Sequence, residues 1–267
     1  CVRFLFFSRP LCLRRSGHQL LLDFLFHCGW KHMSRGTILI TGTSRGIGAS
    51  LLDICLDQGW NVIACQRKVK GEIGTLRSNC DSSCHKIELD VSREDLVQKA
   101  FRSIAQSFSR IDVLVNNAGV FPEPTDTPFE SLKPSWFHEA FSVNLLGTAM
   151  VTQACLPFLK KSSNGRIVNI SSGASSITKR EGRRYCYGAS KAAQNHMTRG
   201  LANEFFDQNL TVVALSPGWV ITDMGGSQAD LDSKEAATQM EKTIRQLTLE
   251  KSGQFLDRFG ESDTYLW

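Results

Sequence analysis

The sequence predicts a single-domain α/β fold in which helices cover both faces of a doubly wound parallel sheet of about seven strands. A length of 267 residues suits one sizeable α/β core. From residue 37 onward, short β-branched runs alternate with longer helical patterns, which is typical of βαβ units. A glycine-rich turn joins the first of these runs to the first helical pattern. Apolar residues make up 42% and charged residues 21% of the chain, which indicates an ordinary globular protein.

Seven β-rich runs have the length of strands, and five segments between them show helical periodicity. The helix near 92 begins with Ser92 and carries Asp95 three residues later, which predicts a capping box. Ligands of such a sheet bind at the carboxyl ends of the strands, so we expect the functional residues in the loops that follow them. The expected strands are 37–41, 61–66, 86–89, 111–116, 166–171, 211–215 and 253–257, and the expected helices lie near 46–58, 92–109, 131–160, 187–206 and 233–250.

The first 32 residues differ in character from the rest, and we expect the folded domain to comprise residues 33–267. The first methionine is Met33, so residues 1–32 are interpreted as leader sequence or as a targeting segment. Their arginine-rich, acid-poor composition would suit a mitochondrial transit peptide; otherwise we expect a cytoplasmic protein. The apolar run 20–26 is too short to cross a bilayer and contains Asp23, so no membrane span is expected.

The formal net charge of +5 is concentrated at the start of the chain. Residues 1–32 contain five basic residues and one acidic residue, which is +4 and leaves +1 for the remainder. A nearly neutral domain is not expected to bind nucleic acid. The nine cysteines have irregular spacing, which favours reduced thiols in an intracellular protein. Cys80, Cys84 and His85 lack a second ligand pair downstream, so no metal site is expected.

The turn after the first predicted strand has the composition of a phosphate-binding loop. Its sequence is Thr41-Gly-Thr-Ser-Arg-Gly-Ile-Gly48, and a helix follows directly. Glycines allow the backbone to approach a pyrophosphate, and the helix N-terminus offers free N–H groups and a partial positive charge. A nucleoside-triphosphate loop is excluded, because no Gly-Lys-Ser/Thr sequence follows.

The glycine spacing Gly-x-x-x-Gly-x-Gly is followed in order by further motifs. They are Asp90-Val91, Asn116-Asn-Ala-Gly119, Asn144, Asn169-Ile-Ser-Ser172, Tyr187-Gly-Ala-Ser-Lys191 and Pro217-Gly218. This set resembles the short-chain dehydrogenase/reductase family, whose fold is Rossmann-type, and within it the C-factor and sniffer-type carbonyl reductases. The resemblance implies that Asp90 holds the adenine and that residues 117–119 line the adenosine ribose. The cofactor-binding residues expected from the motifs and this resemblance are Gly42, Ser44, Arg45, Gly46, Ile47, Gly48, Arg67, Asp90, Val91, Asn117, Ala118, Gly119, Tyr187, Lys191, Pro217, Gly218, Val220 and Thr222.

The end of the second predicted strand indicates which nicotinamide cofactor is bound. An acidic residue at this position binds the ribose hydroxyls of NAD, whereas a nearby arginine accommodates the extra phosphate of NADP. Here the strand ends in Gln66-Arg67-Lys68, without a carboxylate, and Arg45 projects from the glycine turn. NADP(H) is therefore favoured over NAD(H). The alternative is that Arg67 and Lys68 only solvate the end of the strand.

Tyr187 and Lys191 are four residues apart, so their side chains share one face of a helix. An ammonium beside the phenol should lower the pKa of Tyr187 toward neutral, as acid–base catalysis requires. The family resemblance implies that Ser172 hydrogen-bonds the substrate oxygen. It also implies that Lys191 binds the nicotinamide ribose and that Asn144 holds a water that relays protons to it. The 15-residue gap from Ser172 to Tyr187 is longer than is common in the family, and Ser171, Ser175 and Ser176 compete for the serine role.

These residues predict an oxidoreductase that transfers a hydride between NADP(H) and a small carbonyl or alcohol substrate. A catalytically idle NADP(H) sensor on the same fold is the alternative, but such proteins usually lose the tyrosine or the lysine. An epimerase or dehydratase of the related longer family would need more chain after the sixth strand. The helices 131–160 and 187–206 offer faces for a homodimer or homotetramer. The basic segment 179–184 is either a solvated loop or a lip that favours anionic substrates.

Overall fold

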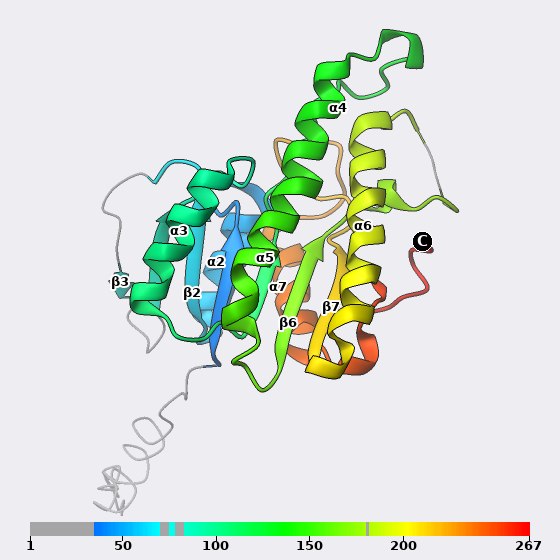
Figure 1. Ribbon diagram of the computed structural model, residues 1–267. Coiled ribbons are helices and arrows are strands. Elements are labelled where there is room, and N and C mark those ends of the chain that lie inside the picture. The colour runs from blue at the N-terminus through cyan, green and yellow to red at the C-terminus, as the bar shows by residue number, and fades with distance from the viewer. Residues whose placement is uncertain (1–34, 70–74, 78–82, 180–181) are drawn as a thin grey trace, which may run out of the picture. The chain divides into compact units, whose positions relative to one another are not determined.

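The computed structural model of the protein describes residues 35–69, 75–77, 83–179 and 182–267. These residues form one sheet with the strand order β3-β4-β2-β1-β5-β6-β7-β8 (Figure 1). All neighbouring strands pair in parallel except β3, which is antiparallel to β4, so the expected sheet of seven parallel strands is confirmed. The strands are β1 (Thr37–Thr41), β2 (Asn61–Gln66), β3 (Thr75–Arg77), β4 (Ser83–Glu88), β5 (Val113–Asn116), β6 (Gly165–Ile170), β7 (Leu210–Ser216) and β8 (Phe255–Asp257).

Helices lie on both faces of the sheet (Figure 1). One face is covered by α2 (Gly46–Asp57) and α7 (Ser233–Gln246), and the other by α3 (Glu94–Ser107), α5 (Thr148–Leu159) and α6 (Tyr185–Phe205). Each face has its own apolar core, because side chains alternate across the strands: Ile38 and Ile40 of β1 pack on one side and Leu39 on the other. The central strands are buried on both faces, which explains their continuous apolar sequences.

The sheet order reverses between β1 and β5. Chain connections after β1 lead outward to β2 and β4, and the chain then returns to place β5 on the other side of β1. Loops that leave β1 and β5 in opposite directions open a crevice at the carboxyl ends of these strands. The candidate site lies there.

Several predicted elements differ from the observed ones. β3 was not predicted; it is only three residues long and has no alternation long enough to recognise. The single helix expected at 131–160 is a 3₁₀ turn (Phe129–Ser131), α4 (Pro134–Phe141), a π-helix (Ser142–Gly147) and α5. The helix expected at 233–250 ends at Gln246. The described residues also form the short 3₁₀ segments Gly173–Ser175, Phe206–Gln208 and Leu249–Lys251.

The predicted capping box at Ser92 is wrong. The helix α3 begins at Glu94 with Arg93 as its N-cap residue, and Arg93 makes no side-chain cap. Both Ser92 and Asp95 bond to other partners: the hydroxyl of Ser92 donates to Asp90, and Asp95 accepts from the guanidinium of Arg93. The side chains of Ser92 and Asp95 therefore bond to residues close to them in sequence and do not cap the start of α3.

The segment Pro134–Leu159 passes a test of length and apolar composition for a membrane-crossing helix, with a mean hydropathy of 1.3. In this fold, however, α5 packs on the sheet. Val151, Cys155 and Leu159 are completely buried there. Burial in the core accounts for the apolar character of this face.

Candidate active site

A cavity of about 390 Å³ lies at the carboxyl ends of the parallel strands. It is lined by the glycine turn after β1, the loops after β2, β4, β5, β6 and β7, and the first two turns of α6. Most residues expected from the sequence to bind a cofactor line it: Gly42, Ser44, Arg45, Gly46, Ile47, Gly48, Arg67, Asp90, Val91, Asn117, Ala118, Gly119, Tyr187, Lys191, Pro217 and Thr222. Gly218 and Val220 were also expected, but they are not part of the lining; Val220 is buried in a small apolar cluster with Leu231 and Ala236.

The glycines of the turn are required by its backbone. Gly42 and Gly46 have φ values of 72° and 56°, which residues with a Cβ atom rarely adopt. A Cβ on Gly48 would lie 2.2 Å from the carbonyl oxygen of Gly42 and 2.4 Å from Nδ2 of Asn117. The turn leads into α2, whose N-cap residue Arg45 contributes no side-chain cap. The first N–H groups of α2 therefore face the cavity without a capping side chain, as an anionic phosphate would require.

The turn is fastened to the loop after β5. Oγ1 of Thr41 accepts the backbone N–H groups of Asn117 and Ala118, both at 3.0 Å. Nδ2 of Asn117 donates to the carbonyl oxygens of Thr41 and Gly42 at 2.8 and 3.2 Å. These bonds hold two walls of the cavity at a fixed separation.

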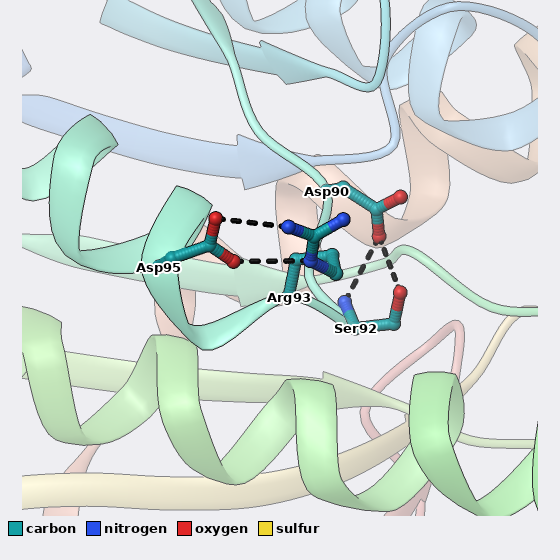
Figure 2. A network of polar contacts seen from close by, with 4 residues as sticks. All are labelled: Asp90, Ser92, Arg93 and Asp95. Atoms are coloured by element: carbon teal, nitrogen blue, oxygen red, sulfur yellow. Dashed lines mark hydrogen bonds and ion pairs between the residues drawn. The ribbon is translucent and has the colours of Figure 1, made fainter.

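Asp90 lies on the wall formed by the loop after β4. One of its oxygens accepts from the backbone N–H of Ser92 at 3.0 Å and from the hydroxyl of Ser92 at 2.7 Å (Figure 2). Arg93 and Asp95 form a separate ion pair at the start of α3. The tight turn at Ser92 therefore fixes the orientation of the Asp90 carboxylate at the cavity.

Two arginines lie at the end of the cavity near β2. Arg67 and Arg45 both line it, and both are exposed. The guanidinium of Arg45 also forms an ion pair of 2.6 Å with Asp223, which belongs to the loop after β7. The two cations expected to favour a 2′-phosphate thus both line the cavity, and Arg45 is shared with a neighbouring carboxylate.

Tyr187 also lines the cavity, and Ser172, which is not part of the lining, contacts it. Their side chains are hydrogen-bonded, which lowers the pKa of the Tyr187 phenol, but burial outweighs this effect and raises it above its ordinary value. The ring of Phe121 lies against the Tyr187 ring with a centroid separation of 5.0 Å. The phenol is therefore held in an apolar environment and keeps its proton at neutral pH.

Four serines compete for the hydrogen bond to the substrate oxygen, and their contacts distinguish them. They are Ser171, Ser172, Ser175 and Ser176. Ser171 donates to Oδ1 of Asn195 at 2.7 Å, and Ser175 donates to the carbonyl oxygen of Ser172 at 2.6 Å. Ser176 bonds to the backbone of the C-terminal segment. Ser171 lines the cavity but is bonded away from the phenol, so Ser172 is the serine whose side chain reaches Tyr187.

Lys191 lies at the cavity wall but is only 3% exposed. Its Nζ donates to the carbonyl oxygen of Ile170 at 2.7 Å and to Oε1 of Gln194 at 3.2 Å. Burial lowers its pKa to about 7. The pKa of Tyr187 is therefore raised rather than lowered toward neutral as expected, because burial disfavours the phenolate, and burial also weakens the positive charge that Lys191 carries at neutral pH.

Asn144 is completely buried in the π-helix. Its side-chain amide bonds the backbone of Val120 in both directions, at 2.8 and 2.9 Å, and donates to the hydroxyl of Ser190 at 2.9 Å. The backbone carbonyl of Asn144 accepts from Nε2 of Gln194 at 3.0 Å, and Gln194 in turn accepts from Lys191. Gln194 thus connects Lys191 to the backbone of Asn144; the water that the family resemblance implies beside Asn144 stays a prediction.

The fold agrees with the comparisons with known proteins. The model of the short chain dehydrogenase family matches residues 36–232. The chain belongs to this family. It is 34% identical over 209 residues to L-fucose dehydrogenase from Mus musculus, which covers 78% of this chain and 74% of that protein. This family member is accordingly an oxidoreductase that acts on alcohol or carbonyl groups.

Two solved structures resemble it over almost their whole length. The NADPH-bound carbonyl reductase from chicken fatty liver has a TM-score of 0.76 and 28% identity, covering 86% of this chain and 99% of that one. The carbonyl reductase Sniffer of D. melanogaster has a TM-score of 0.76 and 28% identity, covering 87% and 99%. The resemblance to sniffer-type carbonyl reductases noted in the sequence is therefore confirmed at the level of the fold.

Gln194 and Glu123 are residues of this site that the sequence analysis did not identify. Gln194 is three residues after Lys191, and this spacing is a local signal that could have indicated a contact. Glu123 bonds to the backbone of Tyr187 from a position 64 residues away in sequence. No local pattern could have revealed that contact.

Proposed function

We propose that this protein is an NADP(H)-dependent reductase of small carbonyl compounds. The observation that carries the proposal is the contact of Ser172 with the protonated phenol of Tyr187, which lines one cavity together with the glycine turn. A proton donor and a second hydroxyl at one point can stabilise the oxygen of a carbonyl group as negative charge develops on it.

The residues of the cavity fit a nicotinamide dinucleotide. The glycine turn and the start of α2 would hold the pyrophosphate, because both line the cavity and the N-terminus of α2 has no side-chain cap. Asp90 would contact the adenine, and Arg45 with Arg67 would contact a 2′-phosphate through charge-assisted hydrogen bonds. The cofactor would supply the hydride, while the protein supplies orientation and the proton.

The proton chemistry favours reduction. Tyr187 holds its proton at neutral pH, so its hydroxyl can donate to a carbonyl oxygen while Ser172 hydrogen-bonds the same oxygen. Lys191 has a pKa of about 7 and is joined through Gln194 to the backbone of Asn144, so it can exchange a proton near neutral pH within a buried network. Support for the NADP preference comes from the lack of a carboxylate at Gln66-Arg67-Lys68 and from the NADPH-bound chicken carbonyl reductase.

The test is a spectrophotometric assay of NADPH oxidation with reactive dicarbonyl compounds and quinones, with NADH in parallel. We expect turnover with NADPH that is lost in Tyr187→Phe, while calorimetry shows that this variant still binds NADPH. Tyr185→Phe is the matched control, because its ring contacts Phe129 and it lies two residues away. Tight NADPH binding by the parent protein without turnover on the whole panel would instead favour an NADP(H) sensor.

A further inference from the structure

Glu123 is a buried carboxylate next to the reacting tyrosine. It lies in the loop after β5 and is only 2% exposed. Its Oε1 accepts the backbone N–H of Tyr187 at 2.8 Å. Its Oε2 is buried and has no hydrogen-bond partner among the residues that the structure describes. A buried carboxylate with one unused oxygen is costly, so the contact that Glu123 does make requires an explanation.

The contact replaces a helix cap. Arg184 is the N-cap residue of α6 and contributes no side-chain hydrogen bond. Tyr187 is in the first turn of α6, where N–H groups have no partner within the helix. A carboxylate is favoured at this position by the helix dipole. The residue that satisfies this N–H group therefore comes from a loop 64 residues earlier in the chain.

We propose that Glu123 is a positioning residue that fixes the first turn of α6, and with it the Tyr187 side chain, against the loop that follows β5. The same loop carries Asn117–Gly119, which line the cavity, and Phe121, whose ring lies against Tyr187. The hydrogen bond from the Tyr187 N–H to Glu123 thus fixes Tyr187 relative to this cavity-lining loop. The inference rests on the proposed function only for its effect on turnover.

The charge of Glu123 has a second consequence for Tyr187. Burial is the largest cause that raises the pKa of the phenol, the hydrogen bond from Ser172 and the charge of Arg184 lower it, and the charge of Glu123 raises it further. These groups come from the loop after β5, the loop after β6 and the start of α6. Removing the negative charge favours the phenolate and must lower the pKa of Tyr187. The pKa of the Cys186 thiol is raised mainly by burial and also by the charge of Glu123.

The first experiment measures the phenol without turnover. The chain contains three tyrosines, so ultraviolet absorbance of tyrosinate is followed against pH in the full chain, with Tyr187→Phe in each background to identify the Tyr187 step. Glu123→Gln keeps an oxygen that accepts from the Tyr187 N–H but removes the charge. We expect the absorbance change of Tyr187 to occur at lower pH in Glu123→Gln than in the parent protein. Glu130→Gln, which removes an exposed charge nearby in the chain, should not move it. An unchanged step in Glu123→Gln overturns the electrostatic part of the proposal.

The second experiment tests positioning. Glu123→Ala removes the acceptor as well as the charge, and misplacement of a reacting group typically costs on the order of ten- to a hundredfold in rate. We expect kcat to fall by this factor relative to Glu123→Gln, with the KM for NADPH unchanged. Equal kcat values in Glu123→Ala and Glu123→Gln would show that the hydrogen bond to the Tyr187 N–H does not position the phenol, and would overturn this part of the proposal. If Glu123→Ala does not fold, Glu123→Asp, which shortens the side chain, provides the same comparison. A parent protein without turnover contradicts the proposed function but leaves the absorbance result interpretable.

Discussion

The guanidinium of Arg45 lies 2.6 Å from the carboxylate of Asp223, and the pair joins the glycine turn after β1 to the loop after β7. Both side chains are largely exposed, at 69% and 74%, so the pair contributes little to folding. The pair bears on the proposed NADP(H) preference, in which Arg45 is one of the two arginines that would contact a 2′-phosphate.

Asp223→Asn should release Arg45 for the phosphate. Since exposed pairs contribute less than about 1 kcal/mol, we expect a tightening of NADPH binding by no more than about fivefold, with NADH binding unchanged. Arg45→Ala should weaken NADPH binding by on the order of tenfold or more without affecting NADH. Dissociation constants for both cofactors, measured by calorimetry, check the prediction. Equal losses for NADPH and NADH in Arg45→Ala would show that Arg45 does not contact the 2′-phosphate.

Gly173 supports the loop of Ser172 through its contact with the C-terminal segment. A Cβ on Gly173 would lie 2.8 Å from Cε1 of Tyr265, whose ring stacks on Phe255 at 5.2 Å. Gly173→Ala should therefore lower the free energy of unfolding by roughly 1–3 kcal/mol. Tyr265→Ala in the same chain should relieve part of this loss, so a double-mutant cycle measured by urea unfolding should show coupling. Additive effects of the two substitutions would refute the contact.

The buried Lys191 makes stability depend on pH. Its pKa is about 7 in the fold and near 10.5 when unfolded, so between these values the unfolded chain binds more protons. The contribution of Lys191 to stability therefore rises with pH over this range and is constant below it. We expect the parent to gain up to about 1.4 kcal/mol per pH unit relative to Lys191→Met between pH 7 and pH 10. Unfolding curves at several pH values test this.

Lys242 provides the control for that series, because it is an exposed lysine on α7. Lys242→Met should show no pH-dependent difference from the parent over the same range. A flat difference between the parent and Lys191→Met would mean that Lys191 keeps its ordinary pKa.

Thr41 fastens the glycine turn to the loop after β5. It is 1% exposed, and its hydroxyl accepts two backbone N–H groups. Thr41→Val keeps the shape but leaves both donors without this acceptor, which should cost roughly 2–4 kcal/mol of unfolding free energy. Thr41→Ser retains the hydroxyl and should recover most of it. Thermal or urea unfolding distinguishes the two, and similar stabilities for both would contradict the assigned role.

Features with a local cause could be predicted from the sequence. The glycines at 42, 46 and 48 are dictated by the backbone of one turn, and the strands of the parallel sheet are recognisable by their continuous apolar runs. Tyr187 and Lys191 share a helix face because of their spacing alone. Most of the residues that line the cavity were identified without a structure from these motifs and from the family resemblance that they carry.

Contacts between distant segments, and the electrostatics of burial, were decided only by the tertiary structure. The sequence does not reveal that Glu123 caps the helix of Tyr187, that Arg45 is shared with Asp223, or that Lys191 bonds to Gln194 and Ile170. Nor does it show that burial raises the pKa of Tyr187 and lowers that of Lys191, opposite to what their spacing alone suggests. Side-chain identity sets the ordinary pKa and the local backbone preference, whereas desolvation and long-range hydrogen bonds depend on which segments the fold packs together.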